Sequence, residues 1–245
     1  MLEDRRLERV YDGIELVGSV GNPTARTMCI MSFVACLAGE GRTDSPMTAS
    51  PVLRDFAIII NDRMPPEVRR HLKPFAPLII GTNDGLDETR AEVLRKALAD
   101  EILPRIQREH RDPQSTRRRG GVLRRAWAGL FEGNLRRRIV DLLDEAAWGH
   151  RPGLGIELAH AAGQLISLCA LEAGSADDEG WYWGKAIQLL DRLCSVGAEG
   201  RAPGVRPDRL EWLERILAAH GLVVDRRGAE PTSLSTLAAR FPGVV

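Results

Sequence analysis

The apolar residues of this chain fall mainly three or four positions apart, the spacing of one face of a helix. A helix with such a face can pack it against a core and leave its polar side in water. The first segment of this kind predicts an amphipathic helix that ends near Gly18. Its apolar face consists of Leu7, Val10, Tyr11, Ile14 and Val17.

Capping signals predict where two further helices begin. The dipeptides Asn22-Pro23 and Ser50-Pro51 each fit an N-cap and a first helical position. The polar side chain accepts a hydrogen bond from a free amide there, and proline lacks an amide that would go unused. The first of these helices is expected to be in the core, because it is apolar on most sides, and to end at Gly39 or Gly41. The second is expected to stop at the Met-Pro-Pro sequence that follows it.

The next part of the sequence predicts two helices and one ambiguous segment. A short helix is expected in PPEVRRHL, cut off by Pro74 and Pro77. The apolar residues 78–80 carry no period and also fit a strand. A longer helix is expected from a cap at Asp87, and Pro104 should bend or end it because proline removes one hydrogen bond of the ladder. The apolar face of this helix consists of Leu94, Leu98, Ile102 and Ile106.

Residues 108–121 read REHRDPQSTRRRGG and have no apolar period, so they are the best linker candidate in the chain. They separate an expected N-terminal helical subdomain, residues 1–107, from a C-terminal one, residues 122–245. All five tryptophans lie in the C-terminal part. The helices expected there span about residues 123–143, 154–173, 178–196 and 207–220, with a short one at 233–240.

The predicted fold class is therefore all-α, a bundle-like protein of about eight helices that can divide into two subdomains. At 245 residues the chain is long enough for one large domain or two modest ones. Hydrophobic residues make up 44% and charged residues 28%, which excludes the disordered class and indicates an ordinary globular protein.

Charge is balanced in total but not in distribution. Between Arg105 and Arg138 lie eleven arginines and three acidic residues, a net charge of +8, so the rest of the chain carries −8. The chain has only three lysines, and a GC-rich genome alone can produce such an arginine bias. A basic binding face, if the arginines form one, is thus confined to this segment. Its candidate residues are Arg117, Arg118, Arg119, Arg124, Arg125, Arg136, Arg137 and Arg138.

The arginine segment supports three functional interpretations besides an ordinary solvated face. The leading one is a non-catalytic adaptor or assembly component that binds an acidic protein, or the negative part of another copy. The runner-up is nucleic-acid binding, in which each neutralised phosphate releases counterions. Against it stand the −8 of the remaining chain and the lack of a helix-turn-helix signal. A membrane-surface helix with Trp127, Leu130 and Phe131 on its apolar side is the third, but core packing explains the same stripe.

Common catalytic and cofactor motifs are missing from the sequence, and no cofactor is expected. Gly180 and Gly184-Lys185 enclose three aromatic residues where a phosphate-binding loop needs four residues. Gly153-Leu-Gly155 lacks the third glycine of a dinucleotide fingerprint, and no GxSxG, HExxH or EF-hand pattern occurs. The residues carry no resemblance to a family specific enough to name.

A metal-dependent enzyme remains a further alternative because acidic and amide side chains recur at turns in the first half. Oxygen ligands of this kind suit Mg²⁺ or Ca²⁺, although local hydrogen bonding at turns and caps explains the same residues. His160 on an apolar helix fits a catalytic base or, better, a hydrogen-bonded core or interface histidine. The turn residues are Glu40, Thr43-Asp44, Asn61-Asp62 and Asn83-Asp84.

Cysteine usage and the apolar segments favour a reduced, cytoplasmic protein. Cys29, Cys36, Cys169 and Cys194 form no CxxC pair and are expected to be buried thiols that act as small hydrophobes. The N-terminal sequence has no signal-peptide core. The longest apolar segment, 156–171, is interrupted by polar residues, so no transmembrane segment is expected.

Reversing Arg117, Arg118 and Arg119 together to glutamate should change the free energy of unfolding by less than about 0.5 kcal/mol, since exposed linker charges contribute little to stability. Thermal unfolding measures this. A shift of many degrees would show that the segment is packed and that the linker prediction is wrong.

Overall fold

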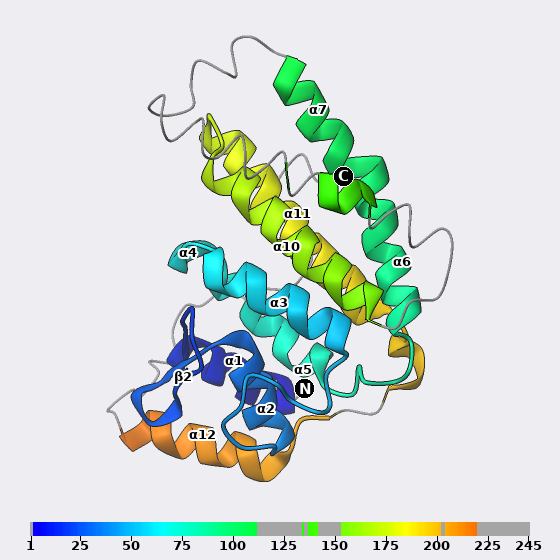
Figure 1. Ribbon diagram of the computed structural model, residues 1–245. Coiled ribbons are helices and arrows are strands. Elements are labelled where there is room, and N and C mark those ends of the chain that lie inside the picture. The colour runs from blue at the N-terminus through cyan, green and yellow to red at the C-terminus, as the bar shows by residue number, and fades with distance from the viewer. Residues whose placement is uncertain (1, 112–133, 135–136, 142–152, 202–203, 220–245) are drawn as a thin grey trace.

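The computed structural model describes residues 2–111, 134, 137–141, 153–201 and 204–219 (Figure 1). Helices dominate these parts of the chain, and the strands are three segments of two residues each. The prediction of a multi-helix, all-α protein is therefore confirmed.

The first helix, α1 (Leu2–Gly13), is shorter than predicted. The chain leaves the helix because the amide of Glu15 donates to the carbonyl of Arg26, 2.8 Å away, which makes Glu15–Leu16 a strand, β1. β1 pairs in parallel with β3 (Thr27–Met28), and β3 pairs antiparallel with β2 (Gly21–Asn22). The expectation that the helix continues to Gly18 is wrong, because long-range strand pairing takes the amides that the helix would need.

The Asn22-Pro23 cap is present, but it starts only one turn of 3₁₀ helix, Pro23–Ala25. The side chain of Asn22 accepts from the amide of Thr24 at 3.2 Å. Arg26 then ends the turn in the left-handed conformation, with φ of 63°. The apolar helix predicted from this cap begins later, as α2 (Ile30–Ala38), and ends at Gly39, where φ is 81°.

The cap at Ser50 and the stop at Met64 are confirmed for α3 (Pro51–Arg63). The chain then forms α4 (Pro66–Arg69), a 3₁₀ helix (Arg70–Phe75) and α5 (Ala76–Ile79), so Pro74 and Pro77 do not cut it off. Pro77 lies in the first turn of α5, where its missing amide needs no partner. The strand alternative for residues 78–80 is wrong, because residues 78 and 79 belong to α5.

The helix predicted from Asp87 is continuous past Pro104. It consists of α6 (Asp87–Ala97), a π-helical turn (Leu98–Ile102) and α7 (Leu103–Arg111). The π turn widens the backbone next to the carbonyl that the proline ring would otherwise approach too closely. Asp87 itself is not the cap: it lies in the first turn and accepts a hydrogen bond from the hydroxyl of Ser50.

The first four residues of the predicted linker belong to α7, and residues 112–121 lie outside the described residues. Beyond it, α10 (Leu154–Leu171), α11 (Ala176–Ser195) and α12 (Pro207–Ala219) confirm three predicted helices. Of the helix expected over 123–143, residue 134 and residues 137–141 are described, and they are helical. The short helix expected at 233–240 lies outside the described residues.

α10 is the central helix of the fold and packs against α3, α6 and α11 (Figure 1). Small residues let α3 approach it closely: a Cβ added at Gly163 would lie 2.9 Å from Cγ2 of Ile59. By length and composition α10 could cross a membrane, but 61% of it is buried inside the protein, as in a core helix. Helices on both sides of the predicted linker contribute to one buried cluster, while the division into two subdomains stays a prediction.

A fully buried arginine, Arg90, joins α6 to the end of α11. Its guanidinium donates to both carboxylate oxygens of Asp84, at 2.6 and 2.8 Å, and to the backbone carbonyls of Leu193 and Val196. These hydrogen bonds with Arg90 lower the pKa of Asp84 to about 2. The stabilisation from this pair is therefore complete above the ordinary carboxyl pKa of 3.8 and is lost as the pH falls through about 2.

Asp84→Ala should lower the free energy of unfolding by about 3–5 kcal/mol, because it removes the carboxylate bound to the buried charge of Arg90 and leaves only Asp87, 3.8 Å away. Urea unfolding at neutral pH measures the loss, and Asp100→Ala, at an exposed position of the π turn after α6, is the control. A loss similar to that of the control would contradict the role given to this pair.

Candidate functional site

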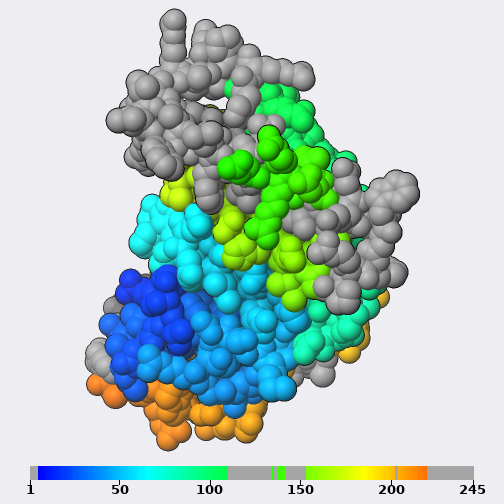
Figure 2. Space-filling model, in the orientation of Figure 1, coloured from blue at the N-terminus to red at the C-terminus, as the bar shows by residue number. Residues whose placement is uncertain are grey.

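The structure describes two of the eight arginines of the predicted binding face. Arg137 and Arg138 lie in the helical segment 137–141, and the other six, at positions 117–119, 124, 125 and 136, lie outside the described residues. Both side chains are exposed, and Figure 2 shows this segment, in green, at the surface of the molecule. The arginine-rich binding face thus remains a prediction, and the structure gives the position and exposure of its last two residues only.

One buried residue anchors this segment, and its neighbours face solvent. Ile139 is fully buried, whereas Val140 is 47% exposed. Arg138 lies 3.7 Å from Glu157 of α10, and because both side chains are half exposed this pair contributes little to stability. Arg137 has no ion pair among the described residues. Arg137 and Val140, three positions apart, share one face of the helix.

Arginines in the rest of the described chain are largely used to hold the fold together. Arg105 bridges Glu109 of its own helix and Asp178 of α11, and it stacks over the ring of Trp181 at 5.2 Å. Arg201 donates to the carbonyl of Val196 at 2.7 Å. Arg137 differs from these arginines, because it forms no ion pair among the described residues.

The rejected phosphate-loop pattern lies inside α11, as expected. Lys185 is only 5% exposed and donates to Glu101 and Gln188, both at 2.6 Å. A lysine bound in this way is not presented to a phosphate.

The acidic turns do not form one cluster. Asp84 binds Arg90, while Asp44 lies close enough to Asp62 for its negative charge to help raise the pKa of Asp62, after the larger effect of burial. Glu40 accepts from the amides of Met47 and Thr48, which is the local hydrogen bonding expected at a turn. Among the described residues, no three histidine, cysteine or acidic side chains are arranged to hold a metal ion.

His160 is an interface histidine with both ring nitrogens engaged. Its Nδ1 lies 2.9 Å from a carboxylate oxygen of Asp55 on α3, and its Nε2 lies 2.8 Å from the amide nitrogen of Gln164. This arrangement joins α3 to α10 and confirms the hydrogen-bonded interpretation.

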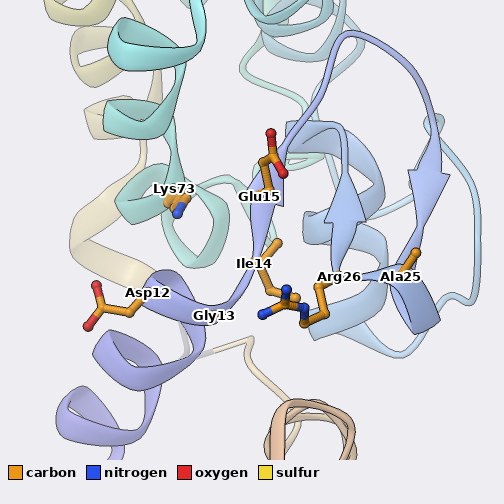
Figure 3. A pocket seen from close by; sticks show the side chains of 7 residues that line it. All are labelled: Asp12, Gly13, Ile14, Glu15, Ala25, Arg26 and Lys73. Carbon is orange, nitrogen blue, oxygen red and sulfur yellow. The ribbon is translucent and has the colours of Figure 1, made fainter. Parts of the chain in front are cut away.

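A cavity of about 330 Å³ lies where the end of α1, β1 and the two 3₁₀ helices meet (Figure 3). Sequence reasoning missed it, because its residues are far apart in the chain and none belongs to a motif. Lys73 donates to the backbone carbonyl of Tyr11, and burial lowers the pKa of its ammonium group. The lining residues are Asp12, Gly13, Ile14, Glu15, Ala25, Arg26 and Lys73.

No family model, curated protein or solved structure matches this chain.

The four cysteines are free thiols and buried, as predicted. Cys29 is more than a small hydrophobe, because its sulfur caps α2 by accepting from the amide of Ser32 at 3.2 Å. Burial raises the pKa of Cys36 to about 11 and raises that of Cys194 further. Protonated, buried thiols are poor nucleophiles.

The rate at which iodoacetamide alkylates these cysteines should be lower in the native protein than in urea, by a factor on the order of a hundred. The reason is that reaction requires opening of the core. Mass spectrometry of timed samples measures each site. A cysteine labelled equally fast in both states would be an accessible thiolate and would contradict this assignment.

Proposed function

We propose that this protein is a non-catalytic, cytoplasmic interaction protein, an adaptor or assembly component that binds an acidic protein surface through its arginine-rich face. The observation that carries the proposal is the exposed Val140 beside Arg137. Interface hot spots are enriched in arginine, which supplies both charge and a large contact area. Arg137 is exposed and has no ion pair among the described residues, and Val140 adds apolar contact area beside it.

The charge distribution supports an acidic partner. The segment from Arg105 to Arg138 carries +8 and the rest of the chain −8, so another copy of this protein also offers a complementary surface. Electrostatic complementarity of this kind speeds association and selects the partner. Four buried thiols without a disulfide agree with a reducing compartment.

Nucleic-acid binding through the same face is the second candidate, and the density of arginine is the single feature that favours it. Phosphates need cations and hydrogen-bond donors, and an apolar Val140 adds nothing to their binding. The negative charge of the remaining chain also opposes an extended polyanion. A metal-dependent enzyme draws less support, because Asp84, one of its three acidic turns, is bound to Arg90.

Val140→Ser and Arg137→Glu should each weaken partner binding about tenfold or more, with little change in melting temperature, since both positions are exposed. Binding is measured by self-association of the purified chain and by quantitative capture of partners from the native cell. Arg5→Glu, an exposed charge reversal on α1, is the control.

The same preparation tests the second candidate with random duplex DNA. We expect negligible binding in about 150 mM salt. Two results together would support nucleic-acid binding instead. The first is micromolar affinity whose logarithm falls linearly with the logarithm of salt concentration, by about 0.9 per phosphate contacted. The second is an affinity that Val140→Ser leaves unchanged.

A further inference from the structure

The cavity in Figure 3 is lined by two acidic and two basic side chains that the fold keeps apart. Asp12 ends α1, Glu15 begins β1, Arg26 follows the first 3₁₀ helix and Lys73 lies in the second. Among the described residues, none of these four charged groups forms an ion pair with another. Elsewhere in the described chain, opposite charges do close into contact, as Arg6 and Glu214 do at 2.7 Å.

Backbone hydrogen bonds explain why the cavity charges stay apart. The ammonium group of Lys73 is held by the carbonyl of Tyr11, which leaves two of its three N–H groups for another acceptor. The amide of Glu15 is fixed by the carbonyl of Arg26, so the strand direction sets where each side chain leaves the backbone. Figure 3 shows the carboxylate of Glu15 turned to one side of the cavity, and Arg26 and Lys73 on either side of Ile14.

Arg26 adds a second, independent feature at the same place. It is the single non-glycine residue with positive φ in the described chain, at 63°. Its amide donates to Pro23 and its carbonyl accepts from Glu15, so both sides of its backbone are fixed in this conformation. Left-handed backbone is unfavourable for a long side chain such as arginine, and residues kept in it cluster at ligand-binding sites. The guanidinium has no hydrogen bond or ion pair within the described residues.

We propose that this cavity binds a small zwitterion of the size of a free amino acid. The ligand's carboxylate would be held by Arg26 and Lys73, and its ammonium group by the acidic side of the cavity at Glu15. The two carboxylates of the cavity would repel a simple anion, and its two basic groups would repel a simple cation. A zwitterion can pair its carboxylate with the basic groups and its ammonium group with an acidic one. The cavity volume of about 330 Å³ is at the small end of ligand pockets, and its lining is too polar for an apolar ligand.

The test is calorimetric titration of the full chain with the twenty amino acids, followed by the two single-charge analogues of the best binder: the acid without its amine, and the amine without its carboxylate. We expect saturable binding of at least one amino acid at a Kd in the millimolar range or below. Each analogue should bind at least about tenfold more weakly, because it forms only one of the two charge-assisted contacts that the amino acid would form.

Arg26→Asn is the decisive variant, since asparagine tolerates the left-handed backbone and removes only the guanidinium. It should abolish binding without lowering the melting temperature, Arg26→Lys should restore part of the affinity, and Arg5→Asn is the control outside the cavity. The absence of binding by every amino acid up to about 10 mM would overturn the proposal. So would an acid analogue that binds as well as the amino acid, or binding whose affinity is unchanged by either Arg26→Asn or Glu15→Gln.

Discussion

The fold depends on one buried charge. Arg90 is wholly removed from water, so its guanidinium must be satisfied inside the protein or its burial would be strongly unfavourable. Asp84 neutralises it, and the carbonyls of Leu193 and Val196 take further donors. Those carbonyls lie at the end of α11, where a helix leaves acceptors unpaired. One side chain thereby fixes α6, the loop before it and the end of α11 relative to one another. Arg201 donates to the same carbonyl of Val196 and to that of Cys194.

With these elements fixed, α10 fills the space between them through small and apolar residues. A Cβ at Gly155 would lie 3.0 Å from Ala91 on α6, just as one at Gly163 would meet Ile59 on α3, so the two glycines allow close contact on two sides. This packing explains the membrane-like composition of the helix. It also brings Asp55 of α3 to His160, so that this histidine joins the two helices.

Local signals in the sequence predicted most of the described fold, and long-range contacts account for the errors. The Ser50 cap and the helices around α10 and α11 follow from hydrogen bonding and periodicity within one segment. The end of α1 does not. It depends on pairing of β1 with a strand twelve residues away and on the close approach of Leu217, near the far end of the described chain, to Gly13. The arginine-rich segment could be predicted from composition alone. The cavity could not be predicted, because Lys73 is distant in sequence from its other residues and no local pattern indicates that Arg26 has a left-handed backbone.

The charged side chains therefore divide into two groups with different consequences. Charges such as Arg90, Arg105 and Lys185 are paired inside the fold, and their contribution is to its stability and to the relative positions of helices. Arg26 and Arg137 are held in fixed backbone positions but have no ion pair among the described residues. The backbone of each is fixed but the side chain keeps its rotational freedom, so a ligand or partner that binds it must still overcome the side-chain part of the entropy. Both proposals of recognition therefore depend on where the fold places these two unpaired arginines, and not on the density of arginine alone.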